Sequence, residues 1–388
     1  MAFSYIVLGA GRQGVAAAYD LARFGGAARL TLADSEITRA GAAASRVNEL
    51  IGRHVATAIA LDVRDENAVG RAIKGYHVAL SAVPYFYNLA LTKIAIANRV
   101  SFCDLGGHTE TVRLQHRLDD EAKKAGVRVV PDCGMGPGMG NNLAAYAMGL
   151  LDEPEHIYMF DGGLPQSPQP PWNYAMTFNI EGLTNEYSGT LPVLRDGKVT
   201  QLPCFTEFEI VDIPGVGKLE AFIIAGGTST APWSFEGKLK TYQLKVLRYP
   251  GNFAQLKAFS DLGLFLLDPV RVDGNEVVPR HLFHALFEPQ IRVDNVKDVC
   301  IIRVVGVGKK KAKPAQATVE IIDYYDEATG FTAMQRLTGW HLSIIGIMLA
   351  KGEIPAGSHA LELAVSGVAF VREGRKRGFN ISEEITRG

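Results

Sequence analysis

Three glycines near the amino terminus have the spacing of a phosphate-binding turn. Gly9, Gly11 and Gly14 follow the apolar run 5–8 and precede a helical pattern, so they lie between a buried strand and a helix. Such a turn brings backbone N–H groups and the positive end of the helix dipole close to a pyrophosphate. We therefore predict a dinucleotide site, with these residues in the turn: Gly9, Gly11, Arg12, Gln13 and Gly14.

An acidic residue closes the second apolar run of the chain. Asp34 lies about 20 residues beyond the last glycine of the turn, a separation at which a carboxylate meets the ribose of a bound dinucleotide. The carboxylate accepts hydrogen bonds from the ribose hydroxyls and repels a 2′-phosphate, which favours NAD over NADP as the cofactor. Arg39 is close in sequence, and its positive charge leaves NADP open.

Polar residues also end the next strand patterns. Asp62, Ser81 and Asp104 each follow an apolar run, in a stretch where helices and strands alternate up to about residue 150. This alternation predicts a parallel, doubly wound sheet, whose ligands lie beyond the carboxyl ends of its strands. We expect Ser81, Ala82 and Val83 beside the nicotinamide ribose, and Asp104 close to the same end of the cofactor. Asp62 fits either of two roles, contact with the adenine or N-cap of the following helix.

The pattern changes after residue 156 to short strands without intervening helices. The run 242–246 alternates apolar and polar residues, which predicts a sheet with one buried face. Further strands are expected at 156–160, 177–180, 207–211, 219–224, 299–305 and 317–324. This half of the chain should therefore form an α+β substrate domain with a largely antiparallel or mixed sheet.

Two helical patterns, 334–351 and 357–371, end the chain, and their apolar positions need a partner surface. We expect these helices to return to the dinucleotide-binding domain. The predicted organisation is an α/β Rossmann domain over residues 1–150, a substrate domain over 151–330 and C-terminal helices over 331–388. The apolar stretch 342–349 and the exposed edge of the second sheet also favour a homo-oligomer.

Composition excludes several classes of partner. The 388 residues are 47% hydrophobic and carry a formal net charge of −1, so no electrostatic footprint for nucleic acid is present. No stretch of about 20 apolar residues predicts a membrane span, and the first residues enter a strand without a leader pattern, which indicates a cytoplasmic protein. The four cysteines are widely spaced, so neither a disulfide framework nor a metal site is indicated.

Several motifs along the chain resemble those of the saccharopine dehydrogenase (reductase) family. They are Gly9–Gly14, Ser81–Pro84, Cys103–Gly107, Gly134–Gly138, Phe178–Leu183 and Leu247–Gly251. The similarity covers nearly the whole chain and is closest to the lysine 6-dehydrogenase branch, which oxidatively deaminates the ε-carbon of L-lysine with NAD. By this resemblance the contacts to a small-molecule substrate fall on Asp104, on the 182–183 region and on the loop that holds Thr228 and Ser229.

One position departs from the saccharopine-processing relatives. Where they carry an arginine just before a glycine, this chain has Glu181 before Gly182. An arginine would pair with a substrate carboxylate, whereas a glutamate pairs with an ammonium. The difference favours lysine over saccharopine as the substrate.

The proposed chemistry requires control of a proton. Hydride leaves the ε-carbon only when its nitrogen is unprotonated, yet a lysine ammonium has a pKa of roughly 10.4. Asp104 and Glu181 are candidate anchors for the ammonium, and burial would be needed to raise their pKa toward that of a base. His108 and His341 are candidate proton shuttles, or histidines that are merely hydrogen-bonded.

The remaining substrate candidates each have a second interpretation. Arg248 could bind the α-carboxylate or end a strand at the surface, and Tyr174 could belong to an active-site lid or pack a proline-rich loop. Three functions stay open: a lysine 6-dehydrogenase, a dehydrogenase of the saccharopine or carboxyspermidine type that acts on a secondary amine, and a catalytically silent NAD-binding regulator.

Overall fold

The computed structural model describes residues 2–387, and its first half is built on a parallel sheet. This seven-stranded sheet has the order β17-β6-β5-β4-β1-β2-β3, in which all the pairs are parallel. Such an order, with a reversal between β1 and β4, is that of a doubly wound dinucleotide-binding fold, as predicted. Its strands are β1 (Phe3–Leu8), β2 (Ala27–Asp34), β3 (Ala56–Ala60), β4 (Val78–Ser81), β5 (Ser101–Asp104), β6 (Arg128–Val130) and β17 (Gly357–Ser358).

Helices cover both faces of this sheet because residues of each strand alternate between two cores. Along β1, Tyr5 and Val7 pack with α1 (Arg12–Phe24), α2 (Ile37–Ile51) and α13 (His341–Lys351). Ile6 and Leu8 pack on the other face with α3, α4 and α6. The remaining elements of this half are α3 (Glu66–Ile73), the short turn η1 (Tyr85–Tyr87), α4 (Asn88–Ala97), α5 (Thr109–His116), α6 (Asp119–Ala125) and α7 (Met139–Gly149).

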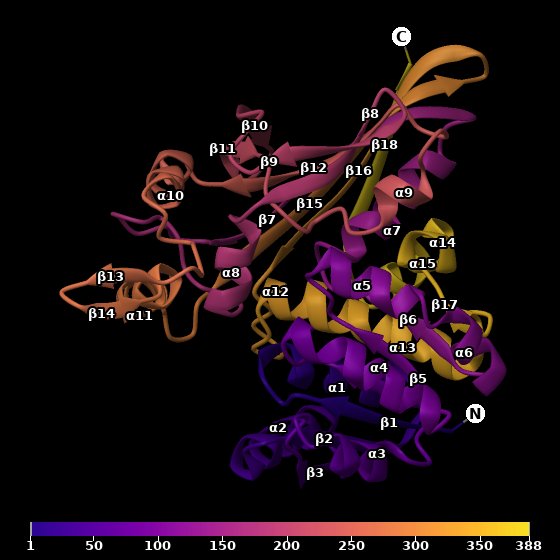
Figure 1. The fold of residues 1–388 in the computed structure, drawn as a ribbon. Helices are drawn as coiled ribbons and strands as arrows, with labels where there is room; N and C mark the ends of the chain where they lie inside the picture. The colour runs from indigo at the N-terminus through magenta and orange to yellow at the C-terminus, as the bar shows by residue number, and fades with distance from the viewer. Residues whose placement is uncertain (1, 388) are drawn as a thin grey trace.

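A mixed nine-stranded sheet forms the second layer, seen above the first in Figure 1. Its path is β10-β11-β12-β7-β15-β16-β18, with β8 beside β12 and β9 beside β8. Only the β12–β7 pair is parallel among these strands. The strands are β7 (Glu153–Pro165), β8 (Thr190–Arg195), β9 (Lys198–Pro203), β10 (Glu209–Ile213), β11 (Gly217–Phe222), β12 (Thr241–Arg248), β15 (Asp298–Lys310), β16 (Lys313–Tyr324) and β18 (Ile381–Arg387).

The prediction that this half lacks helices between its strands is wrong. The expected strand at 177–180 is a loop that leads into α8 (Ile180–Glu186), because the Asn179 side chain accepts a hydrogen bond from the N–H of Gly182 (2.7 Å) and caps the helix. The other insertions are α9 (Ala231–Ser234), α10 (Asn252–Asp261), the hairpin of β13 (Val270–Val272) and β14 (Asn275–Val277), and α11 (Pro279–Ile291).

The end of the chain joins the two halves. A short helix α12 (Ala333–Gln335) and a π-helical turn η2 (Arg336–Trp340) lead into α13, which packs on β4 and β5 as predicted. The expected helix at 357–371 is instead β17, then α14 (Leu361–Ala364) and α15 (Gly367–Lys376), because β17 extends the first sheet beside β6. The last strand, β18, pairs with β16 in the second sheet. A buried ion pair between Arg377 and Asp20 (2.8 Å) anchors this return.

Candidate active site

The carboxyl ends of the first sheet meet the second domain along an interface, which we call the cleft, and hydrogen bonds cross it. Arg12 Nη1 donates to the carbonyl of Met176 (3.0 Å), and Asn185 Nδ2 donates to the carbonyl of Gly107 (3.2 Å). Asp161 of β7 faces Gly136, which lies in the loop after β6. The carboxyl ends of the parallel strands therefore face β7, α8 and the loop before α8.

The glycine turn after β1 has the shape that a pyrophosphate needs. Gly9 has a φ of +96°, and a Cβ atom at Gly14 would lie 1.9 Å from the Gly9 carbonyl oxygen, so neither position accepts a side chain. At Gly11 a Cβ atom would meet nothing within 4 Å. Free space thus lies in front of the first amides of α1, which lack intrahelical partners. Arg12 and Gln13 form the first turn of that helix. These residues fit a dinucleotide.

Asp34 lies beside this turn, at the end of β2. Its Oδ2 accepts from the N–H of Ala10 (2.9 Å), and its Oδ1 accepts from the N–H of Glu36 (3.0 Å). Arg39 Nη1 is 3.3 Å from the same Oδ1. The carboxylate that would bind a ribose and the guanidinium that would bind a 2′-phosphate are therefore neighbours.

Of the other residues predicted around the cofactor, some lie beside the glycine turn and others lie away from it. Ala82 and Val83 pack against Gly9, and the Ala82 N–H donates to the carbonyl of Leu8 (2.7 Å). Ser81 is buried below them, with its hydroxyl on Asn88 Oδ1 (2.8 Å). Asp62 lies in the loop after β3 and forms an exposed pair with Arg64 (2.6 Å), whose hydrogen bonds lower the Asp62 pKa to about 2. The N-cap role proposed for Asp62 is wrong, because Asp65 caps α3.

Two buried acids form the floor of the cleft. Asp104 accepts from Gln115 Nε2 (2.7 Å) and from the N–H of Gly106 (2.8 Å), and burial raises its pKa to about 6. Asp132 accepts from the N–H of Gly107 (3.2 Å) and from the hydroxyl of Ser229. Burial and the adjacent Asp104 raise the pKa of Asp132 well above its ordinary value. Asp104 has no exposed surface and both of its carboxylate oxygens accept hydrogen bonds, so the structure does not present it to a substrate.

A second group of ionisable side chains lines the opposite wall, and two of its acids were not predicted. Arg248 of β12 donates to the hydroxyl of Tyr187 (2.8 Å) and contacts Glu186 Oε2 (3.2 Å) at the end of α8. Asp161 lies on the neighbouring strand, where it pairs with the residue two before Arg248. Sequence alone offered one signal for it, an acid inside the apolar strand that precedes Gly162. No feature of the sequence pointed to Glu186.

Burial controls the electrostatics of this wall. It raises the pKa of Asp161 to about 7 and that of Glu186 to about 7, although the charge of Arg248 opposes both shifts. The Tyr174 ring lies under the Arg248 guanidinium (5.4 Å), and its buried hydroxyl has no hydrogen-bond partner among the described residues. Tyr174 therefore belongs to this cluster. We call the set Asp161, Tyr174, Glu186 and Arg248 the acidic wall.

The predicted role of Glu181 is corrected by its surroundings. Its carboxylate pairs with Arg280 (3.2 Å) and faces His284 (3.8 Å), and 42% of the side chain is exposed. A glutamate that already has a cationic partner in contact with water is a weak anchor for a substrate ammonium. The acidic wall lies elsewhere, because Glu186 is at the last turn of the same helix while Asp161 and Arg248 are on β7 and β12.

The two predicted histidines also differ in position. His108 caps α5 through Nδ1 and stacks on Tyr85 (4.9 Å between ring centroids), next to the 106–107 turn at the mouth of the cleft. His341 is completely buried and bonded to Asn142 Oδ1 (2.9 Å), and burial lowers its pKa to about 4. Of its two interpretations, His341 fits the hydrogen-bonded histidine and neither shuttles a proton nor contacts substrate, because the surrounding residues enclose its ring.

The two polar residues predicted in the loop 227–229 also differ in their surroundings. The Thr228 hydroxyl donates to the carbonyl of Pro192 (2.7 Å), so its side chain holds β8 in place and is not available to a ligand. Ser229 reaches the floor of the cleft through Asp132. Thr228 is therefore reassigned as a structural residue, because its only polar atom is buried and already paired.

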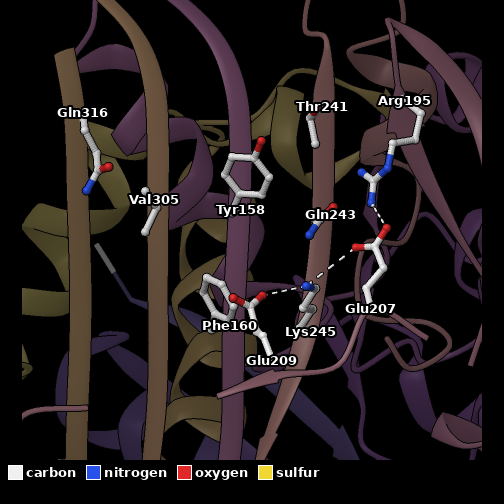
Figure 2. A pocket seen from close by; sticks show the side chains of 10 residues that line it. All are labelled: Tyr158, Phe160, Arg195, Glu207, Glu209, Thr241, Gln243, Lys245, Val305 and Gln316. Atoms are coloured by element: carbon white, nitrogen blue, oxygen red, sulfur yellow. Dashed lines mark hydrogen bonds and ion pairs between the residues drawn. The ribbon is translucent and has the colours of Figure 1, made fainter. Parts of the chain in front are cut away.

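A hollow of about 590 Å³ lies on the opposite face of the second sheet, away from the cleft, and is shown in Figure 2. Lys245, one of its lining residues, pairs with Glu209 (2.6 Å) and Glu207 (3.7 Å), and Arg195 pairs with Glu207 (2.6 Å). Neighbouring strand residues point to opposite faces, so this set and the acidic wall are separated by the sheet. The positive and negative side chains of this hollow are thus paired with one another.

Over residues 2–387 no group of His, Cys, Asp or Glu could hold a metal ion, and no helix could span a membrane.

The fold and cleft define a two-domain protein in which a dinucleotide-binding domain faces a mixed-sheet domain that carries buried acids. The chain belongs to the saccharopine dehydrogenase family, which confirms the resemblance seen in its motifs. The family model described as the saccharopine dehydrogenase C-terminal domain matches residues 134–372, and that described as the saccharopine dehydrogenase NADP binding domain matches residues 5–130.

Curated relatives match part of the chain at low identity. The NADP(+)-dependent, L-glutamate-forming saccharopine dehydrogenase of Pyricularia oryzae is 24% identical over 244 residues, which are 58% of this chain and 51% of that protein. The carboxynorspermidine synthase of Vibrio cholerae is 24% identical over 251 residues, 61% of this chain and 59% of that protein. The chain thus spans little more than half the length of these relatives.

Solved structures share the whole fold. The apo saccharopine dehydrogenase (L-Glu forming) of Saccharomyces cerevisiae has a TM-score of 0.76 at 18% identity, over 99% of this chain and 100% of that one. The homospermidine synthase of Legionella pneumophila, solved in complex with NAD, has a TM-score of 0.68 at 13% identity, over 100% and 92%. Identities this low show a common architecture. These similarities do not show whether the cofactor of this chain is NAD or NADP.

Proposed function

We propose that this protein is an NAD-dependent oxidoreductase that oxidatively deaminates the ε-amino group of L-lysine. The acidic wall is the observation that carries the proposal. It offers a cationic substrate two carboxylates, Asp161 and Glu186, and a single guanidinium, Arg248, which already contacts Glu186. A substrate with several carboxylates would leave such a wall with uncompensated negative charge.

The charges of lysine complement this arrangement. Arg248 would take the α-carboxylate and Glu186 the α-ammonium, since the two side chains already lie 3.2 Å apart. Asp161, across from Gly136 and the carboxyl end of β6, would then face the ε-ammonium. The largely enclosed wall strengthens each of these interactions because little water screens them.

The glycine turn, Asp34 and the 81–83 segment would hold the dinucleotide, which supplies the acceptor for a hydride. The protein must present the ε-carbon with its nitrogen neutral, because the nitrogen lone pair forms the new C=N bond as the hydride leaves. Water adds to this substrate imine and releases ammonia, and the product is 2-aminoadipate 6-semialdehyde, which can cyclise to piperideine-6-carboxylate.

Product analysis tests the proposal directly. Purified protein with L-lysine and NAD should produce NADH and ammonia in equal amounts, and the rate should increase above neutral pH because the ε-ammonium must lose a proton before the hydride leaves. A reaction that forms NADH without ammonia, or no reaction with lysine under conditions where NAD binds, would refute it.

A second candidate is a dehydrogenase that makes or breaks a secondary amine. The names of the curated relatives, saccharopine dehydrogenase and carboxynorspermidine synthase, favour it. Oxidation of NADH or NADPH that requires both an amine and a carbonyl acid would establish this function in place of lysine deamination.

A further inference from the structure

We propose that Asp161 is the group that removes the proton from the substrate ammonium before the hydride leaves. This inference rests on the proposed function and names the base that the function requires. In the step, an N–H bond of the ammonium breaks, its electron pair stays on nitrogen, and the proton forms an O–H bond with the Asp161 carboxylate. The amine becomes neutral and the carboxyl group becomes neutral, so charge is conserved.

The position of Asp161 is the first argument. It lies on β7 in the second sheet, yet its carboxylate reaches across the cleft to the loop that follows β6 in the first sheet. A Cβ atom at position 136 would lie 2.0 Å from Asp161 Oδ2, so only the glycine at 136 leaves room for this approach. The carboxylate is thereby held where the strand ends meet the substrate wall, which is where ligands of this fold bind.

The free lone pairs of Asp161 are the second argument. Among residues 2–387 no hydrogen bond to its side chain is formed, although only 7% of the residue is exposed. The floor acids differ in this respect, since Asp104 and Asp132 accept bonds from Gln115, Ser229 and backbone amides. A largely buried carboxylate that has no protein donor is free to accept a hydrogen bond from a substrate N–H group.

The charges around Asp161 are the third argument. Arg248 faces it from β12, Glu186 from α8 and the Cys300 thiol from β15, while the loop 134–138 brings no ionisable group. Burial raises the Asp161 pKa to about 7 against the influence of Arg248. The group is therefore ionised above neutral pH, and its basicity exceeds that of an exposed carboxylate, which suits proton transfer.

The pH dependence of turnover provides the main test. Wild-type kcat/KM for lysine should decrease below pH 7 along a limb to which Asp161 and Glu186 both contribute. Asp161→Asn keeps the shape, should reduce kcat by about 10²–10⁴-fold, the usual value of a general base, and should leave only the part of this limb that Glu186 supplies. NAD affinity should stay within twofold, which also shows that the variant is folded. The matched control Glu384→Gln, on exposed β18, should behave as wild type.

Chemical rescue separates proton transfer from a structural role. Asp161→Ala removes the carboxylate and leaves space, so added formate or acetate should restore part of kcat in proportion to its concentration. A structural role would not respond to these ions. Three results would each overturn the inference while lysine deamination stands. They are equal rates and equal pH profiles in wild type and Asp161→Asn, a wild-type profile without an acidic limb near pH 7, and no rescue by added ions. A wild-type protein that does not oxidise lysine would overturn both proposals.

Discussion

The two walls of the cleft are built on different principles. The cofactor wall consists mainly of backbone from one short motif, in which Gly9, Gly11 and Gly14 set the path of the chain and leave the start of α1 open. The acidic wall consists of side chains from segments far apart in sequence, with Asp161, Glu186 and Arg248 brought together by the second sheet and α8. A wall made of backbone can serve any dinucleotide, whereas a wall made of side chains determines which substrate is bound.

The two walls also treat charge differently. On the cofactor side, Asp34 has backbone donors and a nearby guanidinium, so its charge is compensated before any ligand binds. On the substrate side two acids share one guanidinium, and burial raises their pKa values. When both acids are ionised, the acidic wall therefore keeps an excess of negative charge, which a cationic ligand would balance.

The largest effect should come from removing the shared guanidinium. Arg248→Met keeps the apolar stem but leaves Glu186 and Asp161 without their cation, which should lower the free energy of unfolding by about 3–5 kcal/mol. Both acids have folded-state pKa values near 7, above those of the unfolded chain. Their neutral forms are favoured in the folded state, so the added loss should be greatest above pH 7 and should decrease toward pH 5. Denaturant unfolding at both pH values measures this. A loss independent of pH would show that only packing was removed.

The glycine turn should give the next largest effect. Gly14→Ala places a methyl group 1.9 Å from the Gly9 carbonyl oxygen, so the backbone must move, at a cost of about 1–3 kcal/mol. Gly11→Ala adds its methyl group to open space and should keep the unfolding temperature while it obstructs the cofactor. Thermal unfolding and calorimetric titration with NAD measure the two properties separately. If both variants lose stability equally, the distinction between these two glycines is wrong.

Sequence patterns predict the cofactor wall better than the acidic wall for a physical reason. A turn between a strand and a helix is a local structure, so the spacing of Gly9, Gly11 and Gly14 and the distance to Asp34 express its geometry directly. The acidic wall depends on the pairing of β7 with β12, which places Asp161 near Arg248 although they are far apart in sequence. No local pattern records that pairing. The resemblance to a family correctly supplied the fold, while the local signal pointed to Glu181, which the structure pairs with Arg280.

Helices inside the second domain were missed for a related reason. The strand expected at 177–180 has β-forming residues, but the cap provided by Asn179 starts α8 there instead. The position of α8 then decides which of its acids faces the cleft. Glu181 lies at its first turn beside Arg280, and Glu186 at its last turn beside Arg248. The sequence pattern did not show that these two acids occupy opposite ends of one helix.

The cofactor preference should change by a smaller amount. Asp34→Ala removes the carboxylate that repels a 2′-phosphate and leaves Arg39 close by, so the preference for NAD over NADP should narrow by about tenfold, or roughly 1.4 kcal/mol. Affinities for both dinucleotides, measured by titration in wild type and variant, give the ratio. Equal affinities in the wild type would contradict the assignment of Asp34, and Arg39→Ala serves as the matched variant that should weaken NADP alone.

The smallest effect is expected at Glu181, and it compares the two acids of α8 most directly. Glu181→Gln removes one charge from a pair with Arg280 that is 42% exposed on the glutamate side, and exposed ion pairs contribute about 0–1 kcal/mol. Turnover of lysine should therefore change less than about threefold.

Glu186→Gln removes a charge in contact with the buried Arg248, so it should reduce kcat/KM for lysine by tenfold or more if Glu186 holds the α-ammonium. Both variants keep the helix and the side-chain volume, and NAD binding serves as the folding control for each. A large loss in Glu181→Gln with none in Glu186→Gln would reverse the assignment and place the substrate ammonium at the first turn of α8, as the sequence alone suggested.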